Sequence, residues 1–526
     1  MYEHLATFLG GPPNPYHFNL YSTWAKHGWG MIITGNVQVS DRHLSLGRDM
    51  VVPRCISKET LEPWKELANC IHGEKNKAKS KSNNAIGTLA IMQLNHAGRQ
   101  SSNFLGGRAP FVSPLAPSAI RVGSTSKEPS LISEAVHRIL FQTPRSMTED
   151  DIDQVVDEFV KGAKLAEEAG FDGIQLHMAH GYLLAQFVSA KANKRTDSYS
   201  TSTPENALRL LRHIVLSIRA AVKRENFVLG IKFNTSDYSS SDENESKRMH
   251  EQEDIALGHI CDIARWGNVD FIEISGGDYE NPEFMISSKA RSSRQAFFAH
   301  FSSRVMAVLH NFDAQDQSAS SSHSKSNSKP LILLTGGLRT PEHIYTALAS
   351  DHAHLLGFGR MSLLCPGLPT VLRQIEASDV GVGRYINPTT PSDMTPLHSL
   401  PEPDLTLSFT QQWPWSWLWT LIPKIKLVGA GVGMAWYIAA ARVWATTRRS
   451  ANENEDLKRQ QMKENEAASD LYRMGPLEAL VWMWIWTRAP ELQQSPGLFM
   501  GLFLFALGVP VSFFGLYTLY NSFTLI

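Results

Sequence analysis

The sequence predicts an α/β protein whose main part is a (β/α)8 TIM barrel, followed by C-terminal hydrophobic helices. Two observations predict the barrel. Short runs of Val, Ile, Leu and Phe recur along residues 1–385, and helical patterns separate them. Strands that are buried on both faces of a parallel sheet are apolar throughout, and repeated alternation with helices favours a sheet of that kind. The chain of 526 residues is long enough for a closed barrel and further segments.

Seven apolar runs are the expected strands, and they lie at residues 29–34, 85–94, 171–177, 227–233, 270–275, 330–335 and 354–358. A closed barrel of this class has eight strands. Because a turn-like stretch and a helix at 16–27 follow Met1 directly, we expect the first strand to be missing. An open barrel exposes the edges of its sheet, which costs stability.

Capping signals place the helices between these runs. The clearest helix begins after Thr148, an N-cap residue followed by three acidic residues, and Gly170 closes it. Its apolar residues recur three and four positions apart, which is typical of a helix with one buried face. A second helix begins at Pro204 and extends to about residue 224, and a third begins at Pro341.

The composition excludes several classes of protein. Lys and Arg number 50 and Asp and Glu number 51, so the net charge of −1 provides no field that would draw the chain onto nucleic acid. The four cysteines are far apart and form no Cys-x-x-Cys pair. This spacing argues against a zinc site, an iron–sulfur cluster and a disulfide framework, so we expect no metal. A reducing compartment fits best, and the first 20 residues carry no secretory signal.

Beyond the barrel domain at 1–385, the composition changes twice. A Pro-rich linker is expected at 386–412, and a membrane-associated helical tail at 413–526. A bilayer core about 30 Å thick needs about 20 apolar residues in a helix, which makes 427–446 and 497–519 the candidate spans. A buried or interfacial helical hairpin is the alternative for the first of these. We expect the tail to anchor the barrel to a membrane, on its cytosolic face.

The strongest chemical signal follows the apolar run at 171–177. His177 ends that run, and His180 and Tyr182 come directly after it. The C-terminal ends of barrel strands carry the active site. Two imidazoles three residues apart can both donate to one carbonyl oxygen, and a tyrosine, with a pKa near ~10, can protonate a carbanion. On composition and spacing alone, these could equally be satisfied polar residues at a strand end. A metal site is less favoured, because no third ligand has suitable spacing.

The segment at 170–199 that contains these residues resembles the substrate-anchoring signature of the old yellow enzyme family, the FMN-dependent NADH:flavin oxidoreductases. Further stretches resemble motifs of that family in the same order, namely QLNHAGR at 93–99, SPLAPS at 113–118, EISGG at 273–277, LTGG at 334–337 and GFGR at 357–360. The resemblance covers about residues 1–385. It implies the barrel fold, the cofactor FMN and the use of NAD(P)H.

The resemblance also implies roles for individual residues. The catalytic residues are His177, His180 and Tyr182. The histidines would hold the carbonyl oxygen of an electron-poor alkene, and the tyrosine would protonate its α-carbon. The FMN-binding residues are Gln93, Lys232, Gly336, Gly337, Gly359 and Arg360. The first two fit the pyrimidine edge, where a cation stabilises reduced flavin, and the other four fit the phosphate. The implied reaction reduces α,β-unsaturated carbonyl compounds, or related electrophiles, with NAD(P)H.

The sequence departs from the family pattern at its start. The family opens with a strand whose end contacts the flavin, and this is the strand that we expect to be missing. One alternative is therefore a flavin-poor, catalytically silent barrel, tethered to a membrane as a binding or scaffold protein. Another is a different flavin reaction on the same scaffold, such as oxidative dehydrogenation or demethylation.

Overall fold

The strands form one parallel sheet. The computed structural model describes residues 3–73, 87–123, 138–234, 245–275, 299–311, 329–336, 338, 341–377, 426–446, 479 and 483. In this part of the chain, the strands of the sheet are β1 (Met31–Ile33), β2 (Val37–Gln38), β3 (Met50–Val51), β4 (Leu89–Asn95), β7 (Gly173–Met178), β8 (Val228–Asn234), β9 (Phe271–Ser275), β10 (Leu331–Thr335) and β11 (Leu355–Gly357). They pair in the order β11-β10-β9-β8-β7-β4-β2-β3, and β1 also pairs with β4. All of these pairings are parallel.

Each of the seven apolar runs overlaps a strand of this sheet, and these strands are β1, β4, β7, β8, β9, β10 and β11. The predicted parallel α/β fold is therefore confirmed, and the sheet is consistent with a TIM barrel. The sequence does not predict β2 and β3, because strands of two residues are too short to show a pattern. It also does not predict the small separate sheet of β5 (Leu115–Ala116) and β6 (Arg145–Ser146).

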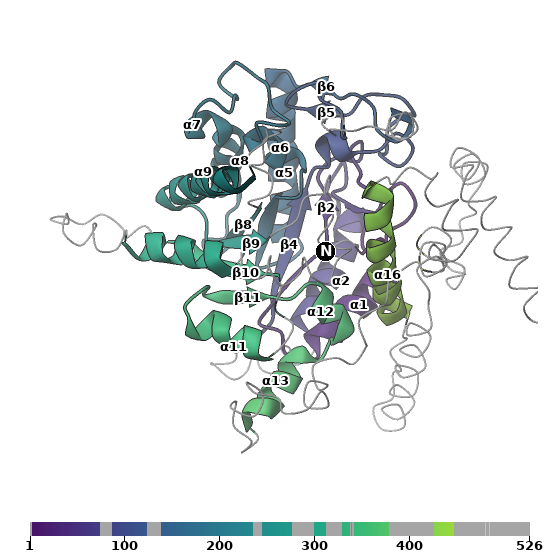
Figure 1. Ribbon diagram of the computed structural model, residues 1–526. Helices are drawn as coiled ribbons and strands as arrows, with labels where there is room; N and C mark the ends of the chain where they lie inside the picture. Colours follow the sequence, from purple (N-terminus) through teal and green to yellow (C-terminus); the bar gives the residue numbers. More distant parts are fainter. Residues whose placement is uncertain are drawn as a thin grey trace, which may run out of the picture. The chain divides into compact units, whose positions relative to one another are not determined.

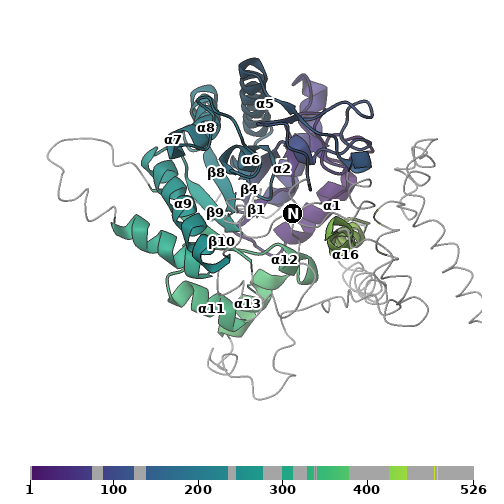
Figure 2. The ribbon, with the colours of Figure 1, turned by 45° about the horizontal axis from the view of Figure 1, so that its top comes forward.

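Helices lie around this sheet. In Figure 2, β4, β8, β9 and β10 lie in the middle of the ring of helices. The helices are α1 (Pro15–Ala25), α2 (Lys58–His72), α5 (Glu149–Glu168), α6 (Leu183–Val188), α7 (Pro204–Ala207), α8 (Arg209–Ala221), α9 (Glu245–Arg265), α11 (Pro341–Ala349), α12 (Arg360–Leu364) and α13 (Leu368–Ala377), with a 3-10 turn η1 (Gly98–Gln100). As predicted, Thr148 caps α5, and its hydroxyl accepts from the amide of Asp151. The helix predicted at 204–224 is instead α7 and α8, and it ends early because Val222 has an extended backbone.

Strands β1 and β11 each have one edge that no described strand pairs with. Among the described strands, β1 pairs only with β4, and β11 pairs only with β10. Trp29 precedes β1 and Phe358 follows β11, and the centroids of their rings lie 5.9 Å apart. The indole of Trp29 also donates to the carbonyl of Pro366 at 2.9 Å. Side chains at the two ends therefore meet across the place where the strands do not pair.

The helix α16 (Lys426–Thr446) corresponds to the first candidate span, 427–446, but it packs against α1 and α12 (Figure 1). Its Arg442 is fully buried and donates to the carbonyl of His4 at 3.1 Å. The indole of Trp444 donates to the carbonyl of Leu363, in α12, at 2.9 Å. These contacts correct the expected span. They agree instead with the alternative of a buried helix, whose apolar residues meet the barrel.

Within the described residues, no helix has the length and apolar character needed to cross a bilayer. Helix α16 belongs to the same compact unit as the barrel, which extends from Met1 to Trp484. The predicted linker at 386–412 and the second candidate span at 497–519 lie outside the described residues.

Candidate active site

The three predicted catalytic side chains lie together at the end of β7. His177 is the next-to-last residue of this strand and is 3% exposed. Its Nε2 lies 3.4 Å from Nδ1 of His180, and its ring centroid lies 4.8 Å from that of Tyr182. His180 has a φ of 58°, in the left-handed region that is strained for a non-glycine residue and is enriched at functional sites. The end of β7 and the turn after it thus bring both imidazoles and the phenol to one place.

His177 is a neutral imidazole at physiological pH. Burial lowers the pKa of His177 well below its ordinary value, and the nearby His180 and Lys232 lower it further. A neutral imidazole keeps one N–H group that can donate a hydrogen bond. Its Nδ1 is buried and has no hydrogen-bond partner among the described residues. This state suits a carbonyl oxygen, which the ring can polarise without giving up its proton.

Asn36 completes this cluster, although no motif in the sequence singles it out. Its Nδ2 donates to the phenol oxygen of Tyr182 at 3.1 Å, and both side chains are buried. Asn36 lies shortly after β1, beyond the C-terminal end of a barrel strand. That position is the signal that could have found it. A donor to the phenol oxygen stabilises the phenolate that remains once the proton has left.

The two residues predicted to bind the pyrimidine edge of flavin belong to one buried polar chain. Gln93 Nε2 donates to Gln175 Oε1 at 2.6 Å, and Gln175 Nε2 donates to Glu273 Oε2 at 2.8 Å. Glu273 Oε1 forms an ion pair with the ammonium group of Lys232. The chain crosses β4, β7, β9 and β8, and His177 is the register partner of Lys232. The polar chain and the catalytic cluster therefore meet on β7, which carries both Gln175 and His177.

Glu273 is ionised in this chain. Burial raises the pKa of its carboxyl group, but Lys232 and hydrogen bonds from Gln175 and Thr335 outweigh this effect and hold the pKa of Glu273 below its usual value. The carboxylate and the ammonium group are 4% and 8% exposed as residues, so each charge depends on the other. Removing one partner of such a pair typically costs about 3–5 kcal/mol, because the remaining charge is buried and unpaired.

The residues predicted to bind the phosphate follow the two last strands of the sheet. Gly336 comes directly after β10, and Gly359 and Arg360 come after β11, where Arg360 begins α12. Because β10 and β11 pair in parallel, these residues are brought to the same end of the sheet. Gly337, the fourth predicted phosphate-binding residue, lies outside the described residues.

These residues fit FMN on structural grounds. Gln93 Oε1 is buried without a hydrogen-bond partner among the described residues, so it can accept from a ligand. Gly336 has a φ of 125°, which only glycine adopts readily, and open space surrounds the place of a Cβ at Gly359. The backbone can therefore approach a phosphate closely at both strand ends. Lys232 and Arg360 supply cations for the two ends of such a molecule.

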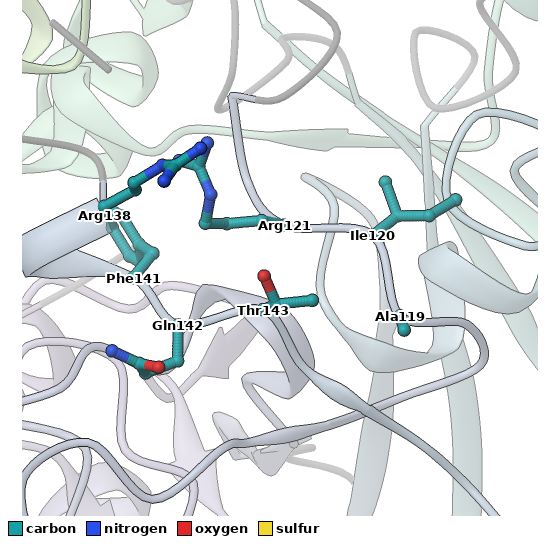
Figure 3. A pocket seen from close by; sticks show the side chains of 7 residues that line it. All are labelled: Ala119, Ile120, Arg121, Arg138, Phe141, Gln142 and Thr143. Atoms are coloured by element: carbon teal, nitrogen blue, oxygen red, sulfur yellow. The ribbon is translucent and has the colours of Figure 1, made fainter. Parts of the chain in front are cut away.

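A cavity of about 660 Å³ lies elsewhere, in the loops between β4 and α5. Figure 3 shows Arg121 and Arg138 turned toward each other in its wall. Ala119, Ile120, Phe141, Gln142 and Thr143 line the rest. None of the predicted site residues lines this cavity, so it does not belong to the cluster at the strand ends.

Comparison with known proteins decides the family. The model of the NADH:flavin oxidoreductase / NADH oxidase family matches residues 10–377. The chain belongs to this family. The flavin oxidoreductase described here is 35% identical over 370 residues to the NADH-dependent flavin oxidoreductase iccE of Talaromyces variabilis, and the match covers 69% of this chain and 79% of that relative. It is therefore an FMN-dependent oxidoreductase that uses NAD(P)H.

A second relative and a solved structure extend the comparison. The NADH-dependent flavin oxidoreductase iliE of Neonectria sp. (strain DH2) is 35% identical over 361 residues, which are 67% of this chain and 41% of the length of that relative. The flavin oxidoreductase thus spans less than half of this longer protein. The structure of 2-naphthoyl-CoA reductase with 2-naphthoyl-CoA matches with a TM-score of 0.50 and 18% identity, over 70% of this chain and 49% of that chain. This likeness concerns the fold alone.

Proposed function

We propose that this flavin oxidoreductase is an ene-reductase, which reduces the C=C bond of α,β-unsaturated carbonyl compounds or related electrophiles. The observation that carries the proposal is the cluster of His177, His180 and Tyr182 at the end of β7, beside the strand that holds Lys232. Membership of the family does not favour the alternative of a catalytically silent barrel.

With FMN held in this site, the cofactor would supply the hydride-transfer chemistry that links NAD(P)H to the alkene. Gln93 and Lys232 would hold its pyrimidine edge, since Gln93 has an acceptor oxygen without a partner in the described part of the chain and Lys232 supplies a cation. Gly336, Gly337, Gly359 and Arg360 would hold its phosphate at the ends of the last two strands.

The side chains of the cluster would have different roles toward the substrate. His177 and His180 would donate to the carbonyl oxygen and stabilise the negative charge that develops on it. Tyr182 would give its phenolic proton to the α-carbon. Asn36, which donates to the phenol oxygen, would stabilise the phenolate until it regains a proton. The product is a saturated carbonyl compound with one new hydrogen on each former alkene carbon.

The test uses the full chain loaded with FMN. The protein is mixed with NADH or NADPH and 2-cyclohexenone, and the loss of the alkene is followed by gas chromatography. We expect cyclohexanone to form with one of the two nucleotides. A protein that holds FMN and oxidises the nucleotide, but leaves the alkene unchanged, would contradict the proposal.

We further propose that residues 497–519 anchor the protein to a membrane, with the barrel on the cytosolic side in a reducing compartment. The support is that no charged side chain follows Glu491. Arg in the middle of a membrane helix costs about 2.5–3.5 kcal/mol. We therefore expect Leu507→Arg to release the protein from carbonate-washed membranes, while the control Leu507→Ile stays bound. A wild-type protein found entirely in the supernatant would refute the anchor.

A further inference from the structure

We propose that Glu273 is a positioning residue for the flavin-binding edge of the barrel. Through Gln175 it orients the amide of Gln93, and by pairing with Lys232 it limits the positive charge that this edge presents. The inference deepens the proposed function, because it takes Gln93 and Lys232 as residues that contact FMN.

The charge of Glu273 sets the direction of the hydrogen bonds in the polar chain. An ionised carboxylate only accepts hydrogen bonds. The atom of Gln175 that lies 2.8 Å from Glu273 Oε2 must therefore be its NH2 nitrogen. The amide oxygen of Gln175 then faces Gln93 and accepts from its Nε2 at 2.6 Å. The carboxylate thus fixes both amides, although β8 and β7 lie between its strand and that of Gln93 in the sheet.

This direction leaves the amide oxygen of Gln93 for a ligand. With its nitrogen turned toward Gln175, Gln93 leaves its Oε1 buried and without a partner among the described residues. A buried acceptor without a donor raises the free energy of the fold, so an N–H group of the bound molecule that donates to this oxygen would be favourable. The pyrimidine half of flavin carries one such group, N3–H, between its two carbonyls. Gln93 is therefore oriented in advance as an acceptor for N3–H.

Glu273 also changes the charge at the pyrimidine edge. A cation at the pyrimidine edge stabilises reduced flavin, which is anionic, and raises its reduction potential. Lys232 is such a cation, but its ammonium group is in direct contact with the carboxylate of Glu273. The positive charge of Lys232 and the negative charge of Glu273 largely cancel, so the net charge beside the flavin is close to zero. Glu273 therefore keeps the potential lower than Lys232 alone would set it.

The test compares three variants of the full chain reconstituted with FMN. Glu273→Gln removes the charge and frees the direction of the amides. Gln175→Leu breaks the link to Gln93 and leaves the ion pair intact. Glu253→Gln is the matched control, because Glu253 is also buried and paired with an arginine, Arg304, but in the outer helix α9. The readouts are the dissociation constant of FMN, from flavin fluorescence, and the midpoint potential, from anaerobic spectroelectrochemistry.

We expect Glu273→Gln to raise the midpoint potential and to weaken FMN binding by about tenfold, the usual effect of losing one well-oriented hydrogen bond. Gln175→Leu should weaken FMN binding to a similar extent and leave the potential nearly unchanged. Glu253→Gln should lower thermal stability without moving either readout.

The possible outcomes separate this inference from the proposed function. An unchanged potential in folded Glu273→Gln, or unchanged FMN affinity in Gln175→Leu, would overturn the inference and leave the ene-reductase proposal standing. If Glu273→Gln does not fold, Gln175→Leu still decides the orientation of Gln93. A wild-type chain that binds no FMN would overturn both proposals.

Discussion

The docking of α16 on the barrel yields a prediction whose size can be worked out. The perturbation is Trp444→Ala. The indole is 6% exposed and donates to the carbonyl of Leu363. A tryptophan buries about 150–250 Å², which at about 25 cal/mol per Å² amounts to roughly 4–6 kcal/mol. Measured truncations of buried aromatic residues cost about 3–5 kcal/mol. We therefore expect the free energy that holds α16 in place to fall by about 3 kcal/mol or more.

Hydrogen–deuterium exchange with mass spectrometry measures this loss locally. A decrease of about 3 kcal/mol in opening free energy speeds exchange by roughly a hundredfold. We expect this acceleration in α16 and in the facing residues of α1 and α12, but not in α5 or α8. The control is Thr446→Ala, at an exposed position whose hydroxyl bonds only to carbonyls of its own helix. Unprotected amides in α16 of the wild-type protein, or an unchanged pattern in Trp444→Ala, would refute the docking.

Three further predictions concern the site and the stability of the fold. Tyr182→Phe should slow the oxidation of the reduced enzyme by an enone by about 10²–10⁴-fold, and it should leave the reduction of the enzyme by NAD(P)H unchanged. Stopped-flow absorbance measures both steps. An equal loss of rate in the two steps would contradict the role of the phenol as proton donor. Asn36→Ala should slow the same enone step by about tenfold. It should also shift the basic limb of the pH–rate profile to higher pH, because the phenolate loses a hydrogen-bond donor and the pKa of Tyr182 rises. An unshifted pH–rate profile would argue against this role of Asn36. His17 is buried and burial lowers its pKa to about 3, so the unfolded chain binds the proton first as pH falls below about 6.5. The free energy of unfolding should therefore decrease as the pH falls from 6.5 to 4. In urea titrations, His17→Gln should reduce the slope of this free energy against pH by roughly 1 kcal/mol per pH unit. The same slope in the variant and the wild type would exclude His17 as a cause.

The sequence revealed the strands well, because a strand buried on both faces is a continuous apolar run. It revealed α16 only as an apolar segment. A helix buried against a barrel and a helix in a bilayer both appear in a sequence as an apolar segment, and the contact partners of α16 lie far away in the chain. Arg442 was the one signal in this segment against a membrane span, since a charged residue within a span is rare. Its partner His4 could not be inferred from any local pattern.

The catalytic cluster was predictable because its three members follow one strand. The polar chain was predictable only in part, because Gln175 and Glu273 act through residues on other strands. A signal for it does exist in the sequence. Four strands carry two polar residues each, separated by one apolar residue, as expected for side chains on the same face of a strand. These pairs are Gln93 and Asn95, Gln175 and His177, Lys232 and Asn234, and Glu273 and Ser275.

The contact between Asn19 and Ala445 joins positions that are 426 residues apart in the chain. At a synthesis rate of about 5–20 residues per second, α1 leaves the ribosome roughly 20–85 s before α16 follows. During that interval the side of α1 that α16 later covers lacks this contact. A chain on a ribosome stalled before residue 426 would therefore present α1 without the contacts that α16 makes with it in the complete fold.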